Sequence, residues 1–201
     1  MNMKKQHIAG IAILIICIIG AFSLSTITLM KSTSSTSSHI NAYSFGDPHP
    51  VLSTGVSVYM EGTGNLQDLL QREIIAKLQE KNIPVFLSDS LLHKYDTHII
   101  ALSIIEKDDI YTPLYSKGTY VIFFYYASSG KPTYFEQFRS GESPVVSFTT
   151  SETGNDKIII EGTVTLKNTS MGVMSPSGYH NHVAEYVAQI ILHELENHLY
   201  Q

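Results

Sequence analysis

The chain has 201 residues, 43% of them apolar and 15% charged, which is enough to build one folded domain and too apolar for wholesale disorder. From residue 32 onward 18 acidic residues stand against 10 basic ones, and this net charge of −8 disfavours nucleic acid and anionic lipid head groups as partners. The only cysteine is Cys17, so the chain beyond it has no disulfide, no thiolate metal ligand and no cysteine nucleophile.

The N-terminal part of the chain is a long apolar stretch. Residues 7–30, HIAGIAILIICIIGAFSLSTITLM, carry no charge and open with an aliphatic run that ends at Phe22. As a helix these 24 residues reach roughly 36 Å at about 1.5 Å per residue, which spans a hydrocarbon core of about 30 Å. We therefore predict a transmembrane anchor over residues 7–30, and the membrane is the first predicted partner.

The charges that flank this stretch predict its orientation. Lys4 and Lys5 precede it, whereas only Lys31 follows it closely, so the positive-inside rule places residues 1–6 in the cytoplasm and the rest of the chain outside the cell membrane. The alternative is a secretory signal cleaved after small residues near Ala21, which would release the domain as a secreted protein.

Residues 31–50 are predicted to form a linker between the anchor and the domain. The segment KSTSSTSSHINAYSFGDPHP begins with a Ser/Thr run, ends with two prolines and has no apolar period, which is typical of a flexible tether. The folded extracytoplasmic domain is then predicted to occupy residues 51–201.

The domain is predicted to begin with a strand and a helix. Residues 56–60 alternate apolar and other side chains at period two, which indicates a strand. Residues 65–82 indicate an amphipathic helix, in which Asn65 and Asp68 are placed to cap the first turn. Its apolar positions recur every four residues at Leu66, Leu70, Ile74 and Leu78.

Several β-rich segments follow. They cover residues 83–87, 97–105, 118–138 (a hairpin that turns at 128–131), 145–150 and 157–167. The acidic pair Asp108–Asp109 is predicted to lie in a solvated turn, and the Gly/Ser/Pro-rich segment 168–179 in a loop. A second amphipathic helix closes the chain.

These elements predict an α+β fold in the order β-α-β-β-β-β-β-α. One mainly antiparallel sheet with both amphipathic helices on a single face buries the apolar side of each helix and is the simplest packing of these elements. A transmembrane helix followed by one extracytoplasmic α+β domain is the predicted architecture.

The C-terminal segment is rich in histidine and glutamate and raises the question of a metal site. A zincin helix needs two histidines four residues apart, but His193 and His198 are five apart, so their side chains diverge by about 140° around the helix. Two weak arrangements of at most two or three ligands survive: His182 and Glu185 with His180, and Glu194 with His198. The spacing therefore disfavours a metal site on this helix. No cofactor is predicted.

Aromatic side chains are dense between residues 111 and 138. If both helices cover one face of the sheet, part of this set lies on the other face, either as an exposed docking surface or beneath loops. Tyr120, Tyr125 and Tyr134 are the candidate binding residues.

No catalytic residue is predicted, because the chain lacks a G-x-S-x-G motif and a complete phosphate loop. The element order resembles that of small envelope-assembly proteins of the LptE-like kind, which implies a binding or assembly role. The leading hypothesis is a membrane-anchored, non-enzymatic binding domain with an envelope protein partner. The alternative is an extracytoplasmic hydrolase or metal-dependent enzyme that uses the His/Glu-rich C-terminal segment.

Overall fold

The computed structural model describes residues 13, 28–45, 55–91, 97–148 and 157–199. None of the helices over these residues is long and apolar enough to cross a membrane. Most of the predicted anchor, residues 7–30, lies outside the described residues.

The described part of the chain forms an α+β fold, as predicted. Its sheet has six strands in the order β1-β6-β5-β4-β2-β3. The long strands β1, β6, β5 and β4 pair antiparallel, and β2 pairs parallel with both β4 and β3. The strands are β1 (Thr28–Phe45), β2 (Val56–Met60), β3 (Val85–Ser88), β4 (His98–Tyr111), β5 (Tyr115–Ala127) and β6 (Lys157–Met174). The helices are α2 (Asn65–Glu80), α3 (Phe135–Arg139) and α4 (Pro176–Leu199).

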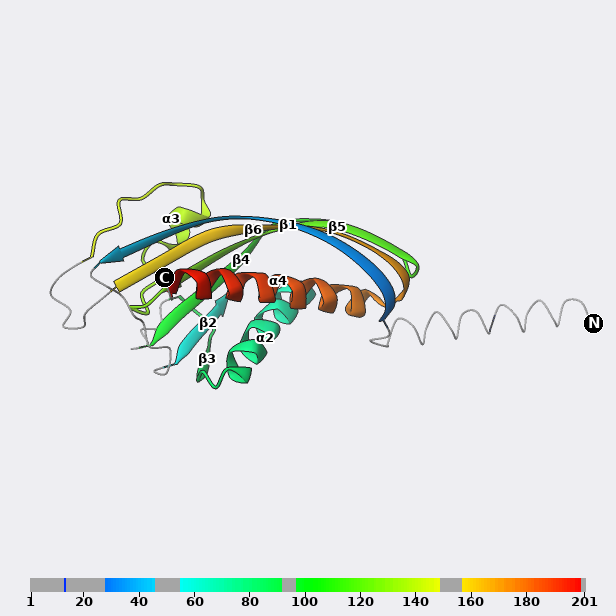
Figure 1. The fold of residues 1–201 in the computed structure, drawn as a ribbon, viewed down its shortest axis with the longest axis horizontal. Helices are drawn as coiled ribbons and strands as arrows, with labels where there is room; N and C mark the ends of the chain where they lie inside the picture. Colours follow the sequence, from blue (N-terminus) through cyan, green and yellow to red (C-terminus); the bar gives the residue numbers. More distant parts are fainter. Residues whose placement is uncertain (1–12, 14–27, 46–54, 92–96, 149–156, 200–201) are drawn as a thin grey trace, which may run out of the picture.

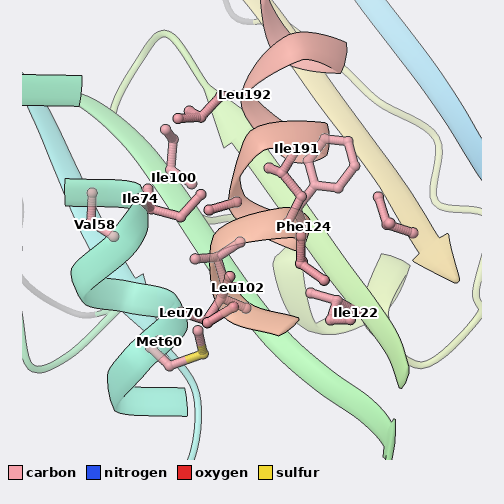
Figure 2. Close-up of a cluster of buried hydrophobic side chains, with 14 of the residues drawn as sticks. Val58, Met60, Leu70, Ile74, Ile100, Leu102, Ile122, Phe124, Ile191 and Leu192 are labelled. Carbon is pink, nitrogen blue, oxygen red and sulfur yellow. The ribbon is translucent and has the colours of Figure 1, made fainter. Parts of the chain in front are cut away.

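Helices α2 and α4 pack against each other and cover the same face of the curved sheet, here called the inner face (Figure 1). The four periodic residues of α2 named above are all buried there, together with Leu69. Figure 2 shows side chains from α2, α4 and the strands meeting in this core. The labelled core residues are Val58, Met60, Leu70, Ile74, Ile100, Leu102, Ile122, Phe124, Ile191 and Leu192.

The opposite, outer face of the sheet carries a second and smaller core. The short helix α3 lies over this face (Figure 1) and buries Phe135 and Phe138 against it. The strand residues beneath include Phe123 and Tyr125, since successive side chains of β5 point to opposite faces. Both faces of the central strands are therefore covered, which explains why β5 is apolar at nearly every position from Tyr120 to Ala127.

The predicted linker is wrong for residues 31–45, because these residues belong to β1. Strand β1 runs from Thr28 to Phe45 and pairs along its whole length with β6. The Ser/Thr run has no apolar period since β1 is an edge strand whose side chains are mostly solvated. Its inward serines are satisfied locally: the Asn168 amide donates to Ser32 Oγ and Ser34 Oγ at 2.7 and 2.8 Å.

The strand boundaries after residue 97 also differ from the prediction. Asp108 and Asp109 lie within β4, which continues past a register shift near Ile104 and ends at Tyr111. The chain turns between β4 and β5 at residues 112–114 and not at Asp108–Asp109. Residues 128–130 do form a turn, but it leads to α3 and not to a second strand of a hairpin.

Three further segments differ. Within the predicted strand 132–138, Phe135–Arg139 is helical, because its two phenylalanines at spacing three both face the outer sheet surface. Residues 145–148 form no strand. The predicted loop 168–179 is instead the end of β6 and the start of α4.

Candidate functional site: a polar cluster and a pocket on opposite faces of the sheet

The three candidate tyrosines lie in two different places. Tyr120 is fully buried on the inner face, and Tyr125 is fully buried on the outer face. Tyr134 lies beside α3 and keeps part of its ring exposed. Of the two alternatives for the aromatic residues, exposure or cover, the structure has the covered one for Tyr120 and Tyr125.

Tyr120 and His180 converge on one carboxylate. The Tyr120 hydroxyl donates to Asp109 Oδ2 at 3.0 Å, and His180 Nε2 lies 3.0 Å from the same oxygen. Lys107 Nζ adds an ion pair at 3.5 Å. Gly118, opposite Asp109, is needed here because a Cβ at that position would come within 2.6 Å of the Tyr120 ring. The cluster joins β4 and β5 to the first turns of α4.

The ring of His180 is held from both sides. While Nε2 donates to Asp109, Nδ1 lies 3.1 Å from the side-chain amide nitrogen of Asn65, which can donate to it. Asn65 therefore does not cap its own helix, which has no side-chain cap, but links the starts of α2 and α4. With both ring nitrogens engaged, His180 is placed to hold the two helices against the sheet rather than to accept a proton from a substrate.

The electrostatics of the cluster favour the charged carboxylate. Burial alone would raise the pKa of Asp109, but the hydrogen bonds from His180 and Tyr120 and the positive charge of Lys107 lower it below its ordinary value. Burial is also the main reason why the pKa of Tyr120 is raised, so its hydroxyl stays protonated and remains the donor.

The predicted metal set is not brought together. His180 is engaged with Asp109, Glu185 is exposed, and His182 Nε2 is buried without a hydrogen-bond partner. Burial lowers the pKa of His182, and the negative charge of Glu185 only partly offsets this. Over the residues that the structure describes, no three His, Cys, Asp or Glu side chains gather as a metal ion would require.

Tyr125 and Tyr134 meet at a pocket of about 260 Å³ on the outer face. Two lysines and several hydroxyl groups contribute to its wall, together with the aromatic rings. The lining residues are Tyr125, Ser129, Lys131, Thr133, Tyr134, Ser147, Phe148, Lys157, Ile158 and Ile159.

Local hydrogen bonds fix the pocket wall. The Tyr125 hydroxyl donates to the backbone carbonyl of Lys131 at 3.2 Å. The Tyr134 hydroxyl accepts from the backbone N–H of Ser147 at 3.0 Å and lies 3.2 Å from its Oγ. These bonds to Ser147 lower the pKa of Tyr134. The two tyrosines thus anchor the segments 129–134 and 145–148 to each other and to β5.

Sequence reasoning named the two tyrosines but missed Lys131, Ser147 and Lys157. These residues come from three separate segments, and no spacing in the chain connects them. The positive charge of the pocket lies in a domain with an acidic balance, so composition gives no signal for it.

No protein-family model matches this chain, and no curated protein matches it. Among solved structures it is similar to the PelC dodecamer from Paraburkholderia phytofirmans, with 12% identity, a TM-score of 0.38 and coverage of 76% of this chain and 95% of that one. It is also similar to the hypothetical protein CT253 from Chlamydia trachomatis, with 14% identity, a TM-score of 0.23 and coverage of 37% and 62%. Likeness at this distance carries no argument about function or assembly.

Proposed function

We propose that the chain is a membrane-anchored, extracytoplasmic, non-enzymatic binding domain that takes an anionic group of an envelope partner protein into the pocket beside Tyr134. The observation that carries the proposal is the composition of that pocket: Lys131 and Lys157 line it next to hydroxyl groups and aromatic rings. Small-molecule sites are concave and mostly apolar with a few polar groups that fix orientation. At about 260 Å³ this pocket is slightly smaller than their usual range of about 300–1,000 Å³, which suits a small group and not a whole drug-sized ligand.

The position of the pocket suits such a role. The apolar stretch that we predict to span the membrane leads into the start of β1 at Thr28, whereas Lys157 is paired with Phe45 at the other end of that strand. A strand of 18 residues extends roughly 60 Å along its path. The pocket therefore lies at the end of the domain opposite the predicted anchor.

The chemistry of the pocket favours a carboxylate. Each lysine supplies a positive charge with up to three donors, and Ser129 and Thr133 add hydroxyl donors. Both lysines also interact with other parts of the chain, so a ligand competes for them. We accordingly expect weak binding of a single small group, with most of the affinity for a partner coming from the surface around the pocket.

The alternative of a hydrolase or metal-dependent enzyme has less support. His180 has both ring nitrogens engaged inside the protein. On α4, His193 lies beside Asn197, and His198 Nδ1 lies 2.8 Å from the backbone carbonyl of Glu194. These contacts favour structural roles for His180, His193 and His198.

A titration with a charged probe and a neutral analogue of the same shape tests the pocket. Because the chain has no tryptophan, Phe148→Trp places a single reporter in the pocket wall. For the full chain in lipid nanodiscs we expect N-acetylglutamate to change the tryptophan emission with a dissociation constant on the order of 1 mM. The neutral diamide of the same compound, in which both carboxylates are replaced by amides, should give no saturable change.

Lysine variants in the same reporter background give the control. Lys157→Gln should abolish the response, whereas Lys167→Gln, on the same strand but outside the pocket, should leave it unchanged. Equal responses to the two probes, or a response that survives Lys157→Gln, would show that the pocket does not recognise an anion and would remove the basis of the proposal.

A further inference from the structure

Exposed apolar side chains gather at one end of the sheet. The hairpin between β4 and β5, the end of β6 and the start of β1 meet there. Their most exposed apolar residues are Leu29 (75%), Leu114 (66%), Ile110 (65%), Met171 (62%) and Tyr115 (37%). We call these five residues the apolar tip.

Strand register places four of these residues on the same face. Met171 pairs with Tyr115, and Leu29 pairs with Val173, two residues further along β6. Ile110 pairs with Lys117, two residues after Tyr115 in β5. Because side chains directly opposite each other share a face and alternate along each strand, Leu29, Met171, Tyr115 and Ile110 all point to the outer face.

The turn is fixed to the neighbouring strands. The N–H of Gly172 donates to the carbonyl of Leu114 at 3.0 Å, and the N–H of Met174 donates to that of Pro113 at 3.1 Å. Gly172 has a φ of +130°, and a Cβ there would lie 2.3 Å from the carbonyl oxygen of Leu29. The backbones of β1, β6 and the turn are therefore closely packed, and the apolar tip is one continuous surface.

The sequence shows that the predicted membrane anchor lies close to the apolar tip. The aliphatic run ends at Phe22, and β1 begins at Thr28. The five residues between them cover roughly 18 Å at most even when fully extended. The predicted span 7–30 also overlaps the first three residues of β1. An anchor in the membrane thus places the start of β1, and the apolar tip with it, at the bilayer surface.

The charges near the tip suit that position. Lys31 is paired with Met171, and Lys117 lies two residues after Tyr115; both lysines are exposed on the outer face. The two acidic residues of β4 on this face, Glu106 and Asp108, lie further from the turn than Ile110. The outer face at the end nearest the anchor is therefore basic, although the domain as a whole is acidic. Apolar residues followed by lysines match the order of acyl chains and phosphate groups in a bilayer.

We propose that the apolar tip docks on the phospholipid bilayer, with its side chains in the interfacial region and Lys31 and Lys117 at the level of the phosphates. The proposal rests on the membrane anchor of the proposed function, and it adds a second contact that sets the orientation of the domain. With two contacts the sheet cannot swing freely about the anchor, so the pocket keeps a fixed distance from the membrane.

Tryptophan quenching by lipids tests this contact. In the full chain reconstituted into phosphatidylcholine–phosphatidylglycerol vesicles, Leu114→Trp supplies a single tryptophan at the tip. Phe45→Trp supplies the matched control, since Phe45 is also exposed but lies at the other end of β1. With acyl chains brominated near the head group, we expect several-fold stronger quenching at position 114 than at position 45. If Leu114→Trp fails to fold, Met171→Trp should give the same result.

Alkaline extraction of the same vesicles separates the two ways of failing. If the chain stays in the membrane and position 114 is quenched no more than position 45, the docking proposal is overturned and the anchor stands. If alkali releases the chain, the anchor itself is wrong, and the docking proposal falls with it.

Discussion

Replacing Phe135 by alanine is expected to lower the free energy of unfolding by about 3–5 kcal/mol, the usual cost of removing a buried phenylalanine ring. Phe135 is fully buried on the outer face. Its ring lies 5.6 Å from that of Phe123 and 6.1 Å from those of Tyr59 and Tyr125. Among the described residues no other helix covers this face (Figure 1). Few side chains can therefore move into the cavity that the alanine substitution leaves.

Guanidinium unfolding of the full chain in detergent, followed by near-ultraviolet circular dichroism, measures this effect. Phe45→Ala is the matched control because its ring is half exposed, and its cost should stay below about 1 kcal/mol. Since α3 follows directly on the pocket segment 129–134, Phe135→Ala should also weaken N-acetylglutamate binding. A loss of stability no larger than that of the control would mean that α3 is not fixed to the sheet.

The second large effect is expected at Asp109. In Asp109→Ala the buried hydroxyl of Tyr120 and Nε2 of His180 lose their acceptor, at about 1–3 kcal/mol for each donor left unsatisfied. Because the Asp109 side chain keeps some contact with solvent, we expect about 2–4 kcal/mol in total. Asp108→Ala, one residue away on the exposed face of the strand, should change stability by less than about 0.5 kcal/mol.

The effect of Asp109 should also depend on pH. Its pKa is lower in the folded protein than in the unfolded chain, so the unfolded state binds the proton first as the pH falls. The stability that Asp109 contributes is therefore complete above the unfolded value of about 4 and is lost as the pH falls through the folded value. Unfolding curves at neutral and acidic pH should show the difference between wild type and Asp109→Ala shrinking in acid. A difference that does not change with pH would contradict the ionised form of Asp109 in this cluster.

Local patterns in the sequence predicted the two long helices α2 and α4, although they missed the short helix α3. Leu66, Leu70, Ile74 and Leu78 recur with a helical period, and all four are buried in α2. The signal is strong because a helix meets the core along one stripe, so spacing alone identifies it. The same holds for α4, whose exposed residues include Glu185, Gln189 and His193 on the polar side.

Strand β1 could not be recognised because nothing in its own sequence marks it. Its stability comes from pairing with β6, whose residues lie more than 100 positions further along the chain. Polar serine and threonine side chains suit an edge strand and a flexible tether equally well, so composition does not distinguish them. The same limit applies to the second half of β4, where Asp109 is charged but has partners from β5 and α4.

The candidate sites could not be predicted from the sequence for a similar reason. Tyr125 and Tyr134 were selected for aromatic density, and the structure does bring them together. Of the two pocket lysines, Lys131 precedes Tyr134 by three residues, but Lys157 and Ser147 come from segments further along the chain. His180 was considered as a metal ligand because histidines cluster along α4. Its actual partners, Asp109 and Asn65, lie on β4 and α2.

The central claim is a domain held outside the membrane by the N-terminal segment, and cysteine labelling tests it most directly. In a Cys17→Ser background, a membrane-impermeant maleimide should label Gln189→Cys, on the exposed side of α4, in intact spheroplasts. Asn2→Cys should be labelled only after the membrane is permeabilised, and the labelled chain should stay with the membrane fraction. Labelling of Asn2→Cys from outside, protection of Gln189→Cys, or recovery of the chain from the medium would contradict the account.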